Sequence, residues 1–214
     1  KLLESIGGVE DYCWKKAKIV FACTNQDLIS LKGLYGETAA HYFVVPNGTQ
    51  VNDVPYVDWV ERDRRKNVLD LGGQLVTIFM GSWHGPNIDA AKRVIHMAKL
   101  LPEVTFIIIG SVCDAISSEP MTKNVKLMGV VNDVEKSVLL GAVDVALNPM
   151  ETGSGSNLKV LDYFAAGTPL ISTEFGVRGI DVIDSIQYKK VSIDKFTDSI
   201  KLLESGYELE RFAI

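Results

Sequence analysis

The sequence has few cysteines, no excess of basic residues and no long apolar run, and each of these absences excludes a class of protein. Its three cysteines, Cys13, Cys23 and Cys113, are widely spaced and odd in number. They therefore form neither a disulfide framework nor a paired metal-binding motif, and a reducing, cytoplasmic environment fits them best. The formal net charge of -5 at pH 7 argues against a general nucleic-acid-binding protein.

Segments that would direct the chain into or across a membrane are also missing. The longest largely apolar run, residues 104–109, has the length of a strand and is too short to span a bilayer. We find no signal peptide, internal repeat or low-complexity segment. The chain begins at Lys1 in helix-like sequence and ends at Ile214 just after another helical pattern, so we expect a fragment of a longer protein.

Present along the whole chain is an alternation of short β-branched runs and amphipathic helical patterns. Several of the expected strands are apolar at nearly every position, which is typical of a parallel sheet covered on both faces. Strands that alternate with helices indicate βαβ units and a doubly wound, Rossmann-like α/β fold. The expected strands are residues 18–23, 42–45, 75–80, 104–109, 125–128, 144–148, 169–173 and 190–193. The expected helices are residues 3–16, 25–35, 57–70, 87–101, 133–140, 157–166 and 195–205.

A turn-rich break near residue 46 divides the chain. The sequence Val45-Pro46-Asn47-Gly48-Thr49 follows an expected strand and precedes a polar, linker-like stretch, so we place a domain boundary there. Residues 1–45 contain too few strands for an independent sheet, and we expect them to be the end of a larger upstream domain.

The most distinctive segment is Gly153-Ser154-Gly155-Ser156-Asn157-Leu158-Lys159, which lies between an expected strand and an expected helix. Its residues offer free amides, hydroxyls and an asparagine N-cap at one helix start, where anions bind favourably. Lys159 in the first turn is placed to reach a diphosphate. The segment has neither the Walker spacing of an ATP-binding loop nor a Gly-x-Gly-x-x-Gly fingerprint. We therefore predict a phosphate-cradling loop, with a capped loop and a solvated lysine as the alternative.

The loop from Met80 to Asn87 is a second candidate, because Gly81 and its neighbours let the backbone approach a ligand at the carboxyl edge of the sheet. An ordinary turn, in which Trp83 packs and His84 lies on the surface, is the alternative. We give His84 only a minor role as a phosphate donor.

Two further positions depend more on context. Asp162 lies one helical turn beyond Leu158, which we expect on the packed face, and Asp162 is able to accept hydrogen bonds from ribose hydroxyls. It is otherwise an exposed helix aspartate. The strand that ends at Gly129 presents backbone groups that can pair with the edge of a base, although by itself it is only a strand end.

Taken in order, these segments resemble the retaining glycosyltransferases of family 4, which have the GT-B fold. The matching pieces are residues 44–48, the Gly81 loop, and residues 106–110, 124–129, 144–149 and 153–169. They span more than half of the chain in unbroken order, and Gly153 to Pro169 is the most specific part. The resemblance implies two Rossmann-like domains that face each other across a cleft, with the acceptor on the first and a nucleotide-sugar on the second.

This resemblance makes the chain the C-terminal half of a GT-B architecture. Residues 1–45 would be the tail of the N-terminal acceptor domain, 46–56 the interdomain linker, 57–193 the donor-binding domain, and 194–214 a helical segment that crosses back. The expected partners are a nucleotide-sugar donor, a carbohydrate or lipid-linked acceptor and the missing N-terminal domain. We expect a cytoplasmic protein, with peripheral association at the inner face of a membrane as an alternative.

The resemblance also assigns roles in a retaining glycosyltransferase. Lys159 would neutralise the β-phosphate of the leaving group, and Ser154 and Glu151 would contact the sugar. The remaining donor-binding residues would be Gly81, Ser82, Gly129, Val130, Gly153, Gly155, Ser156, Asn157, Leu158 and Asp162. No His, Asp or Glu cluster has metal-ligand spacing, so we expect transfer without a metal or cofactor.

Two departures from the family pattern leave alternatives open. Many members carry two glutamates eight residues apart around this loop, where this chain has Ser154 and Asp162. Many also have an arginine near the first loop, where this chain has Ser82 and Trp83. A non-catalytic, degenerate GT-B module is therefore the main alternative, followed by a sugar-nucleotide epimerase of similar architecture and a Rossmann oxidoreductase. We expect residues 1–214 alone to be inactive, because the acceptor half is absent.

Overall fold

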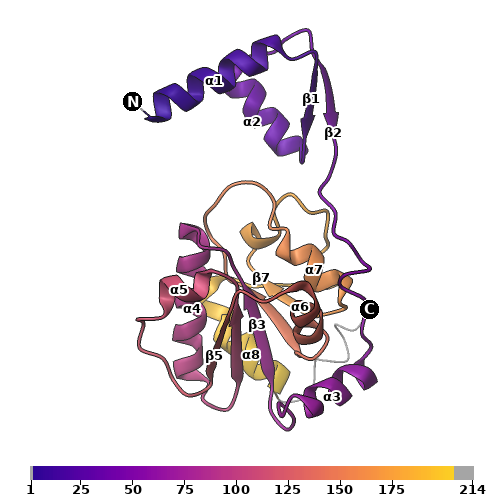
Figure 1. Cartoon of the computed structure of the whole chain (residues 1–214), viewed down its shortest axis with the longest axis vertical. Coiled ribbons are helices and arrows are strands. Elements are labelled where there is room, and N and C mark those ends of the chain that lie inside the picture. The colour runs from indigo at the N-terminus through magenta and orange to yellow at the C-terminus, as the bar shows by residue number, and fades with distance from the viewer. Residues whose placement is uncertain (1, 205–214) are drawn as a thin grey trace. The chain divides into compact units, whose positions relative to one another are not determined.

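The computed structural model describes residues 2–204, and these form two compact units that we describe separately (Figure 1). The first unit ends at Asn47 and the second begins at Gly48, within the turn-rich break. That the first unit is the tail of an acceptor domain stays a prediction.

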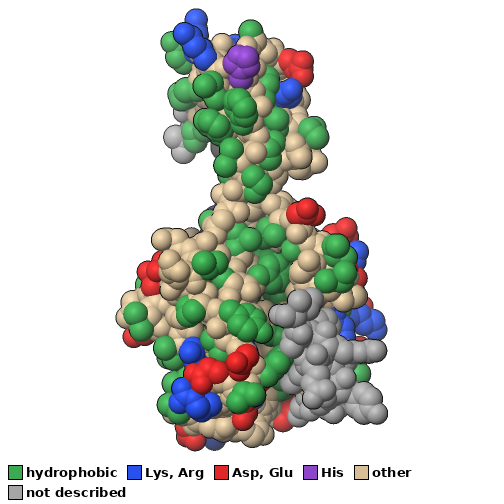
Figure 2. Space-filling view, turned by 90° about the vertical axis from the view of Figure 1, so that its right-hand side faces the viewer, with side chains coloured by type: hydrophobic (Ala, Val, Ile, Leu, Met, Phe, Trp, Pro, Cys, Tyr) green, Lys and Arg blue, Asp and Glu red, His purple; other side chains and the backbone are tan. Residues whose placement is uncertain are grey.

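The first unit combines two helices with a pair of parallel strands. Its elements are α1 (Leu2–Lys16), β1 (Ile19–Ala22), α2 (Asn25–Tyr35) and β2 (His41–Val44). The Thr24 side chain caps α2 by accepting the amide of Asp27. Trp14 is buried, whereas Phe21 and Phe43 stack with ring centroids 5.7 Å apart and stay exposed. Figure 2 shows hydrophobic side chains gathered on one face of this unit. Its own core is small, with Trp14 and Ala22 as the buried hydrophobic residues among those described.

The second unit is built on a six-stranded parallel sheet. Its strands are β3 (Val76–Met80), β4 (Thr105–Ile109), β5 (Val125–Gly129), β6 (Val145–Asn148), β7 (Leu170–Ser172) and β8 (Lys189–Lys190). Their spatial order is β5-β4-β3-β6-β7-β8. From β3 the chain adds β4 and β5 on one side and then returns to add the others on the opposite side. The strand order therefore reverses between β3 and β6, which is where open α/β sheets bind ligands.

Helices cover both faces of this sheet (Figure 1). They are α3 (Trp59–Val68), α4 (Gly85–Leu100), α5 (Val112–Ile116), α6 (Asp133–Leu140), α7 (Lys159–Ala165) and α8 (Phe196–Glu204), with the 3-10 turns η1 (Phe175–Val177) and η2 (Ile193–Lys195). Phe79 packs into the core that includes α4, α5 and α8, and its neighbour Ile78 packs into the core that includes α6 and α7. Alternate side chains of one strand thus pack into cores on opposite faces of the sheet, which confirms the predicted doubly wound sheet.

Buried charges attach α3 to this framework. The Arg62 side chain is 1% exposed and donates to the carbonyl oxygens of Val57, Leu140, Val143 and Ala166. Burial lowers the pKa of Arg62 to about 10, so the guanidinium stays charged at neutral pH. Arg62 therefore adds a charged donor to carbonyl groups at the ends of α6 and α7, where the Leu140 carbonyl also accepts the Thr168 hydroxyl and the Ala166 carbonyl also accepts the Val57 amide.

The expected elements are present, with differences at their ends. Helix α3 begins at Trp59 rather than residue 57, because the Asp58 side chain caps it by accepting the amide of Glu61. Helix α4 begins two residues early, since Pro86 fits the first helical turn. The strand expected at residues 190–193 is present but shorter: it begins one residue earlier and pairs with β7 only at β8, and η2 follows. The five-residue α5 was not predicted, and residues 205–214 of the expected C-terminal segment lie outside the described residues. No helix in the described part is long and apolar enough to cross a membrane.

Candidate functional site

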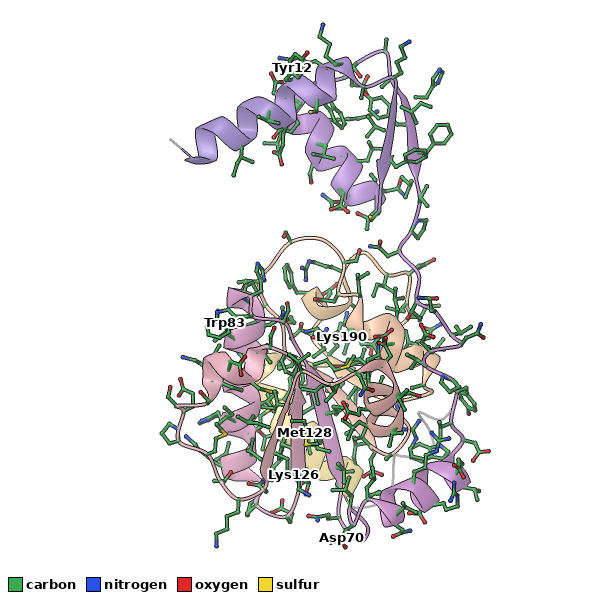
Figure 3. The ribbon with its side chains drawn as sticks, viewed as in Figure 1. Tyr12, Asp70, Trp83, Lys126, Met128 and Lys190 are labelled. Carbon is green, nitrogen blue, oxygen red and sulfur yellow. The ribbon has the colours of Figure 1, made fainter. Side chains whose placement is uncertain are left out.

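A cavity of about 530 Å³ lies at the carboxyl edge of the sheet, between the loops that follow β3 and β6. Two residues labelled in Figure 3 mark the two ends of the strands: Trp83 lies on the loop after β3, at the carboxyl edge of the sheet, and Asp70 lies at the opposite edge. Most of the predicted site residues line this cavity, namely Gly81, Ser82, Val130, Gly153, Ser154, Ser156, Asn157, Leu158, Lys159 and Asp162. The fold therefore brings together the loops after β3, β5 and β6, which are far apart in the sequence.

Lys159 is the first residue of α7 and contributes a cation to the cavity. Its Nζ lies 2.8 Å from Asn87 Oδ1 and 4.4 Å from the centroid of the Phe79 ring. Within residues 2–204, no carboxylate forms an ion pair with this ammonium group. Burial, and after it the positive charge of Arg178, lower the pKa of Lys159 to about 7. The site thus holds a destabilised ammonium group, which an anion would stabilise.

Arg178 is the second cation, and the sequence analysis did not identify it. It directly follows η1, and its Nη2 donates to the carbonyl of Ser154 over 2.8 Å. The guanidinium also lies 4.0 Å from the centroid of the Phe175 ring, and Nη1 donates to the Phe175 carbonyl. Arg178 therefore connects η1 to the Gly153 loop while facing the same cavity as Lys159.

The carbonyl of Gly176 joins the loop to η1. It accepts the side-chain amides of Asn148 and Asn157 at 2.8 and 2.7 Å. A Cβ atom on Gly176 would lie 2.2 Å from Ser172 Oγ, so only glycine allows this approach. Because Asn157 holds the loop and Arg178 follows Gly176, one set of hydrogen bonds positions both walls of the cavity.

The details of the loop correct two predictions. Asn157 is not the N-cap of α7: Leu158 occupies the cap position without a side-chain hydrogen bond, and the Asn157 side-chain amide donates to the Gly176 carbonyl. Leu158 is also not on the packed face: it is 53% exposed, whereas Val160 and Tyr163 are buried against the sheet. The Tyr163 hydroxyl accepts the amide at the end of β3, which fixes α7 to the central strand.

Two other features of the loop favour contact with an anion. Gly153 and Gly155 have φ angles of 129° and 63°, which lie in the region that favours glycine. The hydroxyl oxygen of Ser156 is buried and has no hydrogen-bond partner among the residues described here. A buried hydroxyl without a partner at a cavity wall is a ready donor to a ligand.

Asp162 lies one helical turn after Lys159 on the same side of α7 and lines the cavity. Its Oδ1 accepts the hydroxyl of Thr49 at 2.5 Å, and its Oδ2 lies 3.3 Å from Lys136 Nζ. The same lysine also pairs with Asp133 at 3.2 Å. Burial lowers the pKa of Lys136, but its hydrogen bonds and charge interactions with Asp133 and Asp162 outweigh this effect and raise it.

Glu151, Gly129 and Gly155 do not line the cavity. Glu151 instead pairs with Arg93 of α4 at 2.5 Å and is half exposed. The carbonyl of Gly129 accepts the amide of Gly110, so it is already used within the protein. The expectation that this carbonyl meets a base edge therefore loses its support, while the neighbouring Val130 does face the cavity.

The loops after β3 and β4 approach each other closely. Gly110 has a φ of 100°, and a Cβ atom there would lie 2.1 Å from the carbonyl oxygen of Gly81. Ser111 supports the same contact, since its Oγ accepts the amide of Trp83 at 2.8 Å. This approach shapes the cavity floor, and the sequence offered a signal for it: Gly110 ends an apolar strand just as Gly81 does.

His84 lines the cavity but is exposed and makes no side-chain cap to α4. No group of three or more His, Cys, Asp or Glu side chains in the described residues is arranged to hold a metal ion. That the site works without a metal or cofactor stays a prediction.

Comparisons with solved structures identify the fold. The chain is similar to sucrose-phosphate synthase from Thermosynechococcus elongatus, with a TM-score of 0.78, 16% identity, and coverage of 98% of this chain and 55% of that chain. It is also similar to the Anabaena protein HepE in complex with UDP and glucose, with a TM-score of 0.77, 14% identity, and coverage of 98% and 59%. These neighbours are GT-B glycosyltransferases, so the chain has this fold and spans a little over half of their length.

The chain is also similar to the C-terminal domain of LpcC, a group 1 glycosyl transferase family protein from Francisella tularensis. The match has a TM-score of 0.59 and 18% identity, and it covers 78% of this chain and 92% of the LpcC domain. Comparison with curated protein sequences found no match. The family model described as "Glycosyl transferases group 1" matches residues 74–203. This match covers more than half of the chain and includes the whole six-stranded sheet, β3 to β8. The protein therefore belongs to the group 1 glycosyl transferases.

Proposed function

We propose that this chain binds the nucleotide-sugar donor of a retaining glycosyltransferase that transfers the sugar to a carbohydrate or lipid-linked acceptor. One observation carries the proposal: Lys159 and Arg178 converge on one cavity at the point where the strand order reverses. Burial of Lys159 and then the charge of Arg178 lower the pKa of Lys159 to about 7. Such a pair is costly in an empty site and favourable around a diphosphate, which carries two negative charges.

The chemistry of sugar transfer requires this charge. When the bond between the sugar and the β-phosphate breaks, negative charge develops on the departing diphosphate, and preorganised cations stabilise it. Lys159 and Arg178 would supply the two charges, so we propose that transfer needs neither metal nor cofactor. The Ser156 hydroxyl and the amides of Gly153 to Ser156 would add hydrogen bonds.

The rest of the donor would extend along the cavity wall. Asp162 would accept hydrogen bonds from ribose, and the base would lie beside Val130 at the end of β5. Ser154 would contact the sugar from the Gly153 loop. The HepE structure, which holds UDP and glucose, supports a nucleotide-sugar as the ligand class. Retention of configuration is inferred from the family resemblance, and a cytoplasmic location from the cysteine pattern.

A non-catalytic module is the second candidate, and one observation favours it. Glu151, which was expected with Ser154 to contact the sugar, pairs with Arg93 and does not line the cavity. Ser154 and the cations would then bind a nucleotide without a carboxylate beside the sugar. In either case we expect residues 1–214 alone to show no transfer, because the acceptor is expected on a domain that the chain does not include.

Isothermal titration calorimetry with UDP-, GDP- and dTDP-glucose tests the proposal. We expect the chain to bind at least one of them, and Lys159→Ala to weaken that binding at least about tenfold, which corresponds to about 1.4 kcal/mol. Lys92→Ala is the matched control, because Lys92 is a half-exposed helix lysine paired with Glu119 outside the cavity. Absence of binding to every nucleotide-sugar, or equal effects of both substitutions, would refute the proposal. Binding without transfer, after the chain is joined to its acceptor domain, would support the non-catalytic module.

A further inference from the structure

A second cavity lies between α4 and the segment that contains η2 and the start of α8. Its volume is about 460 Å³, which falls in the range of pockets that hold small molecules. One wall comes from residues 92–100 of α4, and the facing wall comes from residues 193–197. No described residue lines both this cavity and the cavity beside Lys159, which we call the donor cavity. The proposed function therefore gives the second cavity no role.

One turn of α4 presents three nitrogen-bearing side chains to this second cavity, those of Lys92, Arg93 and His96. Residues three and four apart on a helix are neighbours, so His96 lies next to both Lys92 and Arg93. His96 is exposed and forms no hydrogen bond or ion pair with any residue that the structure describes. The three side chains therefore form a cationic end of the cavity, with the imidazole available to a ligand.

The existing partners of the two cations leave donors for an anion. Lys92 pairs with Glu119 at 2.8 Å, and the lysine side chain is 49% exposed. Arg93 donates from Nη2 to Glu151 and from Nη1 to the carbonyl of Pro149. In these contacts the ammonium group uses one of its three donors and the guanidinium uses two of its five. Because exposed ion pairs contribute little to stability, both cations can turn toward a ligand at small cost.

The next turn of α4 is apolar where it lines the second cavity. Met97 is 4% exposed and belongs to the core, whereas Leu100 is 52% exposed. Ile193 lines the facing wall and packs against the same core. The lining therefore changes along α4 from a cationic end to an apolar end. An amphiphile with an anionic head and an alkyl tail has the same polarity.

The charges of the lining favour a phosphate as the head of this amphiphile. Among the described residues, Asp194 is the one carboxylate that lines the second cavity. It accepts the Ser192 hydroxyl at 2.6 Å, and this hydrogen bond lowers the pKa of Asp194. Asp194 therefore opposes the two cations with only one negative charge. A phosphate monoester carries a charge of about -1.5 to -2 at pH 7, and its three oxygens can accept from three side chains at once.

We propose that the second cavity is a binding site for a phosphate monoester that carries an alkyl chain. Lys92, Arg93 and His96 bind the phosphate, and the chain lies over Met97 toward Leu100. The same chemistry occurs in a free amphiphile and in phosphatidic acid of a membrane, and the experiment below distinguishes these sources. The inference does not rest on the proposed function, because no residue of the donor cavity takes part.

The alkyl chain gives the proposal a measurable magnitude. Burial of one CH2 group changes affinity about fourfold, so about three methylene groups over the apolar end exceed a tenfold gain. We therefore expect n-octyl phosphate to bind at least about tenfold more tightly than inorganic phosphate. The cations are partly exposed, so the affinity for both ligands should fall as the salt concentration rises.

Nuclear magnetic resonance titrations of ¹⁵N-labelled residues 1–214 test this proposal, because they follow the two cavities separately. With n-octyl phosphate, we expect the amide signals of residues 92–100 and 193–197 to shift together. Lys92→Met and His96→Ala should each weaken this binding about three- to tenfold. Leu100→Asn should weaken the binding of n-octyl phosphate and leave that of inorganic phosphate within about twofold. Lys99→Met and Val138→Asn, outside the cavity lining, are the matched controls and should change neither.

Three results would overturn the proposal. The first is equal affinity of n-octyl phosphate and inorganic phosphate at residues 92–100. The second is unchanged affinity in both Lys92→Met and His96→Ala. The third is a set of shifts confined to residues 153–159, which would show that the ligand occupies the donor cavity instead. Failure of every nucleotide-sugar to bind would refute the proposed function and leave this inference standing.

Co-sedimentation with phosphatidylcholine vesicles, with and without phosphatidic acid, distinguishes the sources of the ligand. Binding that requires phosphatidic acid and is lost in His96→Ala would assign the site to a membrane lipid. Binding of n-octyl phosphate without binding to these vesicles would assign it to a free amphiphile. Either result supports the site, whereas vesicle binding that is equal in the wild type and in His96→Ala contradicts a membrane lipid in this cavity.

Discussion

Binding of a diphosphate beside Lys159 is expected to take up a proton. In the free protein, burial and then the charge of Arg178 lower the pKa of Lys159 to about 7. A diphosphate against the ammonium group should raise that pKa toward its ordinary range, because an opposite charge favours the protonated form. Complex formation therefore binds a proton at any pH between the two pKa values, and affinity falls as the pH rises above 7.

The size of the effect follows from the titration curve. With a pKa near 7, Lys159 is about 90% protonated at pH 6, about 50% at pH 7 and about 10% at pH 8. Proton uptake per bound ligand is then about 0.1 at pH 6, about 0.5 at pH 7 and about 0.9 at pH 8. Over the same range, the affinity should fall about tenfold.

Calorimetry in pairs of buffers with different ionisation enthalpies measures this uptake. UDP-glucose is a suitable ligand, because its diphosphate is esterified at both ends and does not titrate in this range. Lys159→Met keeps the length of the side chain and removes its charge, so it should abolish both the proton uptake and the pH dependence. Lys92→Met is the control and should retain both. Uptake near zero in the wild type at pH 8, or equal uptake in Lys159→Met, would refute the reasoning.

Three further predictions concern stability and are measured by urea unfolding. Lys159 has a folded pKa below its unfolded value, so the unfolding free energy should rise with pH from about 7 to 10.5. Lys159→Met should therefore stabilise the free protein at pH 6, by about 1–2 kcal/mol because the side chain keeps some solvent contact; a loss of stability would contradict this. Arg62→Leu removes the charged donor shared by four carbonyl groups, two of which keep a second donor, and should cost about 2–4 kcal/mol; no loss would mean that water replaces the guanidinium. Gly110→Ala places a Cβ atom 2.1 Å from the Gly81 carbonyl and should cost about 2–4 kcal/mol, whereas Gly33→Ala on α2, with open space around it, should stabilise by up to about 1 kcal/mol. Equal effects of the two glycine substitutions would show that the close approach is relaxed in solution.

The fold could be predicted because the strands have local signatures. Residues 76–80 and 105–109 are buried at every position, and the side chains of Ile78 and Phe79 pack into cores on opposite faces of the sheet. Short elements are harder to predict, because no hydrophobic period develops in them. The five-residue helix α5 was not predicted, and the bounds of the two-residue strand β8 were missed.

The candidate site could be predicted only where its residues lie in one segment. Lys159 and Asp162 are one helical turn apart, so their common face follows from helix geometry. Arg178 was missed because it is 19 residues after Lys159 in the sequence. It reaches the cavity only through the path of the chain along β7 and η1, where the Gly176 carbonyl accepts the Asn157 side-chain amide. Asn157 was predicted to be a helix cap from its place before an expected helix. The actual partner of its side-chain amide, the Gly176 carbonyl, lies 19 residues away and has no local signal. Thr49, 113 residues from Asp162, shows the same limit.

Nuclear magnetic resonance tests the central claim most directly, by titrating ¹⁵N-labelled residues 1–214 with UDP-glucose. The account predicts that the amide signals that shift most belong to the cavity loops, at residues 81–82, 110–111, 153–159 and 178, while those of α3 and of the first unit stay in place. Saturation without changes in the 153–159 segment, or changes centred on other elements, would contradict the claim that Lys159 and Arg178 form the diphosphate site.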